Sequence, residues 1–179
     1  MILTNSPDLA ERLEQIAFPG LTANFDLSKT AALIVACLDL RDFGREYAQT
    51  CIANAQALAE AIDAGGCPVY HVAGRGFTAS HHVAIPAAAF GGGTTASRRL
   101  EKANILTSGI GLPLPPVAGD YNAIRLGTQE ITRWGLSPQD MPTVAGLICR
   151  VLVKKEAPEQ VQPEVVALRQ RFQTLHFVR

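Results

Sequence analysis

A glycine pair, Gly65-Gly66, divides the chain into two parts with different hydrophobic periods. Before the pair, apolar residues recur at spacings of three and four, which is the period of an α-helix. After it, short runs with β-branched or aromatic residues alternate with helical segments. Since glycine just after a helical pattern is a typical helix stop, the sequence predicts an α/β fold in which helices precede a mixed part.

Three helices are expected before the glycine pair. The first covers residues 6–16 and ends at the turn Phe18-Pro19-Gly20. The second starts at Asp26 or Ser28 as a cap and carries the apolar run 31–37. An interruption at 41–44 separates it from the third helix, residues 47–64. The large apolar fraction of residues 6–64 hints that this part packs against another protein.

Strands and helices alternate after the glycine pair. The expected strands are residues 68–73, 81–87, 104–106 and 122–126, of which the first two are expected to be antiparallel neighbours. The expected helical segments are residues 94–103, 128–134, 138–153 and 163–172, and residues 108–119 are expected to be an irregular loop. Ser137 and Asp140 have the spacing of a capping box.

Composition excludes several classes of protein. The 179 residues are 47% hydrophobic and 18% charged, which is enough for a sizeable core in one compact domain. Basic and acidic residues number 16 each and form no long basic run, so a nucleic-acid partner is not expected. A signal peptide and an apolar run long enough to span a membrane are also absent, so we expect a soluble cytoplasmic protein.

No metal-binding pattern is visible. The four cysteines, Cys37, Cys51, Cys67 and Cys149, are scattered singly, and only Cys67 has a histidine close by, His71. We expect buried thiols in a reducing compartment and no metal site.

Arg125 is the side chain with the clearest chemical potential. It precedes Gly127 near the end of an expected strand, and a planar guanidinium can hold a carboxylate through two parallel hydrogen bonds. The competing interpretation is an exposed structural arginine. The other polar candidate, His82, lies on an expected strand, where a hydrogen-bonded structural histidine is the preferred interpretation.

Several segments resemble, in the same order, the C-terminal half of serine hydroxymethyltransferases and their threonine aldolase and transaldolase relatives. The most specific segment is Ala123 to Gly135, and the others are Phe18-Pro19-Gly20, Asn54 to Glu60, Ser80 to Val83 and Lys102 to Ile105. The resemblance implies the small C-terminal domain of a fold-type I pyridoxal phosphate enzyme, an antiparallel-rich sheet with flanking helices preceded by long inter-domain helices. Residues 1–40 would be a linking helical segment and residues 41–179 the small domain.

The resemblance also implies site residues. Arg125 matches the arginine that binds the carboxylate of the amino-acid substrate. Thr22, Ala23 and Asn24 stand where the family has a glycine-rich loop that approaches the cofactor phosphate of a neighbouring subunit. No catalytic residue is expected in this chain, because the Schiff-base lysine, the aspartate and the stacking histidine of the family lie upstream. Lys29 occupies a helix position in that family and is not expected to bind the cofactor.

Two segments depart from the family. The loop Thr107 to Pro116 contains no asparagine, which puts the use of tetrahydrofolate in doubt. Gly127-Thr128-Gln129-Glu130 differs from the usual Gly-Thr-Pro-Ala and leaves room for transaldolase-like chemistry.

The leading hypothesis is a split enzyme that acts on β-hydroxy amino acids and is inactive alone. A partner chain would carry the lysine and share pyridoxal phosphate, in an α2β2 assembly. A non-catalytic regulatory or binding subunit with the same fold is the alternative, and a fragment of a full-length enzyme is a third possibility.

Overall fold

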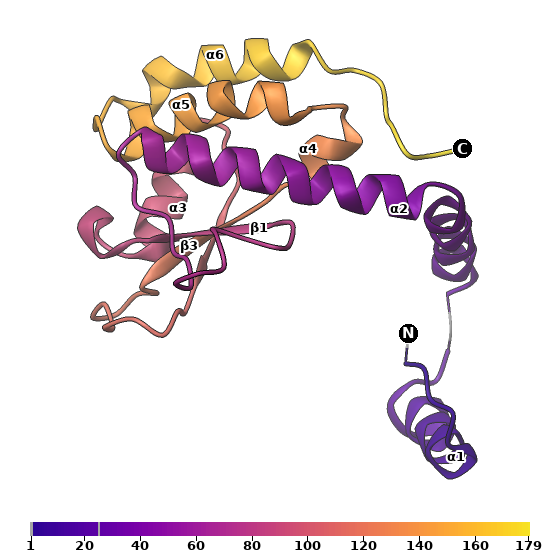
Figure 1. Ribbon diagram of the computed structural model, residues 1–179. Coiled ribbons are helices and arrows are strands. Elements are labelled where there is room, and N and C mark those ends of the chain that lie inside the picture. Colours follow the sequence, from indigo (N-terminus) through magenta and orange to yellow (C-terminus); the bar gives the residue numbers. More distant parts are fainter. Residues whose placement is uncertain (1, 25) are drawn as a thin grey trace. The chain divides into compact units, whose positions relative to one another are not determined.

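The computed structural model describes residues 2–24 and 26–179 (Figure 1). It divides into two compact units, Met1–Arg41 and Asp42–Arg179, which are described separately below. None of the helices in the described ranges is long and apolar enough to cross a membrane. That residues 1–40 act as a linking segment stays a prediction.

The first unit opens with the predicted amphipathic helix. Helix α1 (Pro7–Gln15) has Ser6 as its N-cap, whose hydroxyl accepts a hydrogen bond from the amide of Leu9. A π-helical turn, Ile16–Leu21, follows, and its backbone leaves helical geometry at Phe18. The predicted helix over residues 6–16 and the turn that ends it are therefore confirmed.

Helix α2 (Leu27–Ala64) is a single element of 38 residues. The expected interruption at residues 41–44 is wrong, because Gly44 continues the helix at a cost of only about 1 kcal/mol relative to alanine. The predicted stop is confirmed: Gly66 has φ of +80°, and the amide of Cys67 donates to the carbonyl of Ile62 at 3.2 Å. This pattern closes the open carbonyls of the last helical turn.

The second unit contains a three-stranded antiparallel sheet. Its strands are β1 (His82–Pro86), β2 (Ser108–Ile110) and β3 (Ala123–Gly127), in the order β1-β3-β2. Ala84 of β1 and Ser108 of β2 both lie opposite Arg125 of the central strand. The predicted α/β class with an antiparallel sheet is confirmed.

Two expected strands are wrong. Residues 104–106 belong to the turn after helix α3 (Gly93–Glu101), where Asn104 has φ of 61° and the amide of Ile105 donates to the carbonyl of Leu100. The strand of this region starts later, at Ser108, inside the expected loop. Residues 68–73 contact β1 through the amide of Tyr70 and are not a strand, so the hydrogen-bonded neighbour of β1 is β3.

The remaining helices follow the expected order. They are α4 (Gln129–Arg133), α5 (Met141–Leu152) and α6 (Pro158–Gln170), with short 3-10 turns at Ala88–Phe90 and Pro138–Asp140. Helix α6 starts five residues earlier than expected, because Pro158 fits the first helical turn and the helix tolerates Pro163 inside it. The predicted capping box is present, with the carboxylate of Asp140 accepting from the amide and hydroxyl of Ser137.

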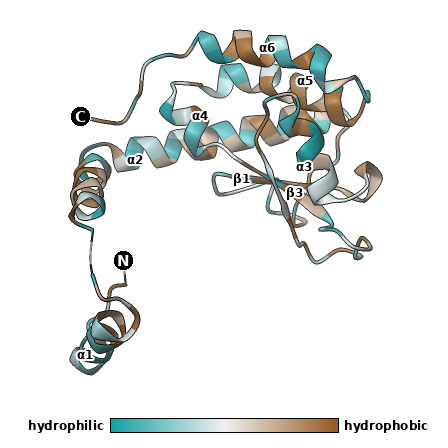
Figure 2. Ribbon diagram, turned by 180° about the vertical axis from the view of Figure 1, so that it is seen from behind, coloured by the Kyte–Doolittle hydropathy of each residue, from teal (hydrophilic) through white to brown (hydrophobic). Residues whose placement is uncertain are grey.

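One hydrophobic core joins these elements. Alternate residues of β1 and β3 are buried, and they pack with the inner sides of α2, α3 and α5; the largest fully buried side chains include Ile62, Ile85, Leu100, Ile124 and Ile148. Figure 2 shows hydrophobic and hydrophilic positions alternating along α5 and α6, as expected for helices with one buried face. The opposite face of the sheet therefore carries the remaining strand residues, Arg125 among them.

Candidate functional site

Arg125 lies in the middle of the central strand β3, with an exposed side chain on the face of the sheet opposite the core. Its cross-strand neighbours, Ala84 and Ser108, are small, and Gly127 two residues along the same strand has no side chain. Within the described part of the chain, no hydrogen bond or ion pair joins the guanidinium to an acidic residue. A planar cation with open space around it and no acidic partner can receive a carboxylate from outside.

His82 lies on the same face as Arg125, on the neighbouring strand β1. It pairs with Gly127 in the strand register, so it is diagonal to Arg125. Its ring centroid is 3.9 Å from that of His81. Burial lowers the pKa of His82, and the neighbouring His81 and Arg125 charges lower it further. His82 is therefore held in its neutral form beside the arginine.

Gln129 also reaches this part of the sheet. A side chain at Gly127 would meet the Gln129 side-chain oxygen at 2.5 Å and the His82 ring at 3.8 Å. The amide of Gln129 and the imidazole of His82 thus lie on either side of the bare Gly127 backbone. Our sequence interpretation considered His82 only as structural, and it treated Gln129 only as a departure from a family pattern.

Asn122 was missed altogether. This buried residue precedes β3, and its side-chain oxygen accepts from the amide of Leu112 at 2.8 Å while its nitrogen donates to the carbonyls of Leu112 and Leu114, both at 2.9 Å. It therefore holds in place the segment that the sequence analysis related to folate. An asparagine before a strand is too common a pattern for the sequence to reveal this role.

Thr22, Ala23 and Asn24 lie in the first unit and are exposed. The amide and the hydroxyl of Thr22 both donate to the carbonyl of Ala17, at 2.9 and 2.5 Å. Both Thr22 donors are therefore engaged within their own turn, which leaves the backbone of Ala23 and Asn24 as the better candidates for an anion. Cofactor binding by these three residues stays a prediction.

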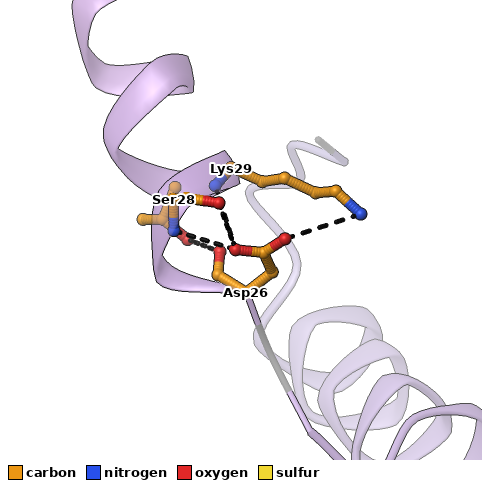
Figure 3. Close-up of polar contacts among 4 residues, drawn as sticks. Asp26, Ser28 and Lys29 are labelled. Carbon is orange, nitrogen blue, oxygen red and sulfur yellow. Dashed lines mark hydrogen bonds and ion pairs between the residues drawn. The ribbon is translucent and has the colours of Figure 1, made fainter.

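Lys29 has a local role at the start of α2 (Figure 3). Its ammonium group lies 3.7 Å from the carboxylate of Asp26, and its side chain is 86% exposed. Asp26 also accepts from the amide and hydroxyl of Ser28, and these hydrogen bonds hold its pKa below its usual range. The other lysines, Lys102, Lys154 and Lys155, are exposed as well, so this chain offers no enclosed lysine for a Schiff base.

The cysteines are not all buried. Cys51, Cys67 and Cys149 are buried as expected, but Cys37 is exposed, because it belongs to a stretch of α2 that the first unit does not cover. The described residues contain no cluster of three or more histidine, cysteine or acidic side chains that could hold a metal ion.

Comparison with known proteins gives close relatives. The chain is 45% identical over 179 residues to an alpha-methylserine aldolase from Ralstonia sp, which covers 100% of this chain and 41% of the aldolase. It is 40% identical over 172 residues to a serine hydroxymethyltransferase from Methanopyrus kandleri, covering 95% of this chain and 40% of the transferase. No family model matches the chain.

The fold has a solved counterpart. The crystal structure of L-threonine transaldolase from Pseudomonas fluorescens superposes with a TM-score of 0.83 and 26% identity, covering 98% of this chain and 40% of the transaldolase. The chain thus spans about 40% of the length of each of these proteins. It belongs to the family of serine hydroxymethyltransferases and alpha-methylserine aldolases, and it corresponds to the C-terminal part of their fold-type I chain.

Proposed function

We propose that this chain supplies the substrate-carboxylate site of a pyridoxal phosphate enzyme that acts on β-hydroxy amino acids. The observation that carries the proposal is Arg125, an exposed guanidinium without an acidic partner in the described structure, surrounded on its strand face by Ala84, Ser108 and Gly127. The family relationship supports it, because relatives include an aldolase and a hydroxymethyltransferase of such amino acids.

The residues of this chain fit the cofactor only in part. The exposed backbone of Ala23 and Asn24 can donate to a phosphate, whereas Thr22 uses both of its donors on Ala17. The covalent link needs an enclosed lysine, which this chain does not offer. When bound, pyridoxal phosphate would supply the electron sink for breaking the bond between Cα and Cβ.

Arg125 would contribute orientation. Two parallel hydrogen bonds from its guanidinium would fix the carboxylate and with it the rotation of the substrate about Cα. That rotation decides which bond at Cα is aligned for cleavage, so a carboxylate clamp acts on the rate as well as on binding. His82, kept neutral beside Arg125, leaves the arginine as the main positive charge of this face.

We further propose that a second polypeptide supplies the part of the relatives that this chain does not match, including the lysine, in an α2β2 assembly. The exposed apolar stretch of α2 supports this: Leu33, Ile34 and Val35 are 48%, 56% and 51% exposed. Successive apolar residues exposed along a helix are typical of a surface that another protein covers. Tetrahydrofolate is not part of the proposal, since the Thr107 to Pro116 loop lacks the family's asparagine.

A non-catalytic binding subunit with the same fold is the second candidate. The engaged donors of Thr22 favour it, because they weaken the case for a phosphate site in the first unit. In that case the chain would still associate with a lysine-bearing partner but would add nothing to cofactor or substrate binding.

The test is reconstitution with a related N-terminal part. The chain is mixed with the segment of the Ralstonia aldolase that precedes its matched region, together with pyridoxal phosphate. Visible absorbance reports cofactor binding, and formaldehyde release from alpha-methylserine reports cleavage of the Cα–Cβ bond. We expect both signals only from the mixture.

Arginine variants separate the two candidates. Arg125→Ala should raise the concentration of alpha-methylserine needed for half-maximal rate by about 10- to 100-fold, the value of a charge-assisted contact. Arg98→Gln, an exposed arginine on α3, is the matched control and should change nothing. A mixture that binds cofactor and cleaves substrate equally well with Arg125→Ala would refute the carboxylate role. A complex that forms without cofactor absorbance would favour the binding subunit.

A further inference from the structure

His82 has the placement of a second carboxylate contact. In the β1–β3 register it faces Gly127, and Arg125 is two residues away on the same face. Diagonal neighbours of this kind lie about 7–8 Å apart at the backbone, which long side chains can bridge. The bare Gly127 between them leaves room for a small anion, with Gln129 on the other side.

The charges around His82 work against its protonation in the free protein. The charged or titratable side chains that act on it are His81, next in sequence, and Arg125 on β3; its other identified neighbours, Ser80 and Gln129, are neutral. No carboxylate is among these neighbours. A carboxylate that binds Arg125 would bring the missing negative charge to the same face of the sheet.

We infer that His82 is a positioning residue for the substrate carboxylate, and that a carboxylate bound to Arg125 draws a proton from solvent onto the His82 imidazole. The protonated ring then donates to the same carboxylate, so that two cations hold it. The inference rests on the proposed function of Arg125 and adds the contact and its pH dependence. No bond other than the N–H bond on the imidazole is made in this step.

Linkage gives the sign and size of the effect. Since the free His82 has a lowered pKa and the bound anion raises it, carboxylate affinity must increase as pH falls through the bound-state pKa. The increase is complete below the free-state pKa. A rise of one pKa unit on binding would strengthen binding about tenfold in total, which is the size expected from one opposite charge nearby.

The experiment uses the full chain and acetate as the carboxylate, with NMR of the histidine ring protons and a titration of acetate at several pH values between 5.5 and 8. We expect acetate to raise the His82 pKa and to bind about tenfold more tightly at the low end of this range. Arg125→Gln should itself raise the His82 pKa and remove the acetate effect. Arg98→Gln should do neither.

The variants distinguish this inference from the proposed function. His82→Gln, which keeps a hydrogen-bonding side chain without titration, should leave acetate binding dependent on Arg125 but independent of pH. If wild-type binding needs Arg125 and is already flat with pH, the His82 inference is overturned while the carboxylate site stands. If acetate does not bind, or binds Arg125→Gln as well as wild type, both are overturned.

Discussion

The stability of the second unit should depend strongly on Asn54. This α2 residue is fully buried, and its side-chain nitrogen donates to the hydroxyl of Thr132 and to the carbonyl of Leu136, both at 2.9 Å. Thr132 in turn donates to the carbonyl of Thr128 at 2.7 Å. The side chain thus ties α2 to the segment that follows the central strand.

The expected cost of Asn54→Ala follows from the contacts that it removes. Two buried acceptors lose their donor, each at about 1–3 kcal/mol. The variant also deletes the side-chain oxygen of Asn54, which is buried without a partner in the described structure, and this offsets one such penalty. The net loss in the free energy of unfolding is therefore about 2–3 kcal/mol. Asn54→Asp should cost more than Asn54→Ala, because a charged oxygen then faces both acceptors.

Urea unfolding followed by circular dichroism measures this loss, with unchanged dependence on urea as a check that the same surface unfolds. Gln56→Ala is the matched control: its side chain is exposed, bonds only the Thr78 carbonyl at 3.2 Å, and should change stability by about 0.5 kcal/mol or less. An Asn54→Ala cost as small as the control's, or an Asp variant as stable as wild type, would show that the buried bonds are misplaced.

Three further outcomes are expected. Gly93→Ala should lower the free energy of unfolding by about 3 kcal/mol or more, measured by urea unfolding, because its new Cβ would lie 2.1 Å from the carbonyl oxygen of Ala123. Asp120 accepts from the first amides of α3, which lowers its pKa, so its stabilisation is complete above its unfolded pKa of about 4 and is lost on further acidification; the melting temperatures of wild type and Asp120→Ala should therefore converge at low pH. Cys37 should be the one thiol that reacts rapidly with a disulfide reagent in the native chain, and reconstitution should protect it; an unprotected Cys37 would contradict the proposed interface.

Local signals in the sequence predicted helix ends well and strands less well. The Ser6 cap, the Gly66 stop and the Ser137–Asp140 pair depend on neighbouring residues alone, so the sequence contains what is needed. The strand at Ser108 has only three residues and owes its position to pairing with β3, which no local pattern records. The expected break near Gly44 failed because one glycine does not outweigh good helix formers on both sides.

The candidate site shows the same division. Arg125 could be found from the sequence, because a family resemblance and the chemistry of a guanidinium both point to it. Its neighbours could not: His82 comes near Arg125 only through the strand register, and Gln129 only because Gly127 leaves space for it. The relation of Thr22 to Ala17 likewise appears only when the backbone turn is known.

The exposed apolar stretch of α2 has a consequence for how the chain must be made in the cell. Residues 31–37 are all small or apolar, and every one of them is exposed. At the concentrations reached during synthesis, helices with such a surface associate with each other or with unrelated chains. Abundance of this chain should then be limited by the supply of whatever covers the stretch, and production in excess should lead to precipitation or degradation of the surplus.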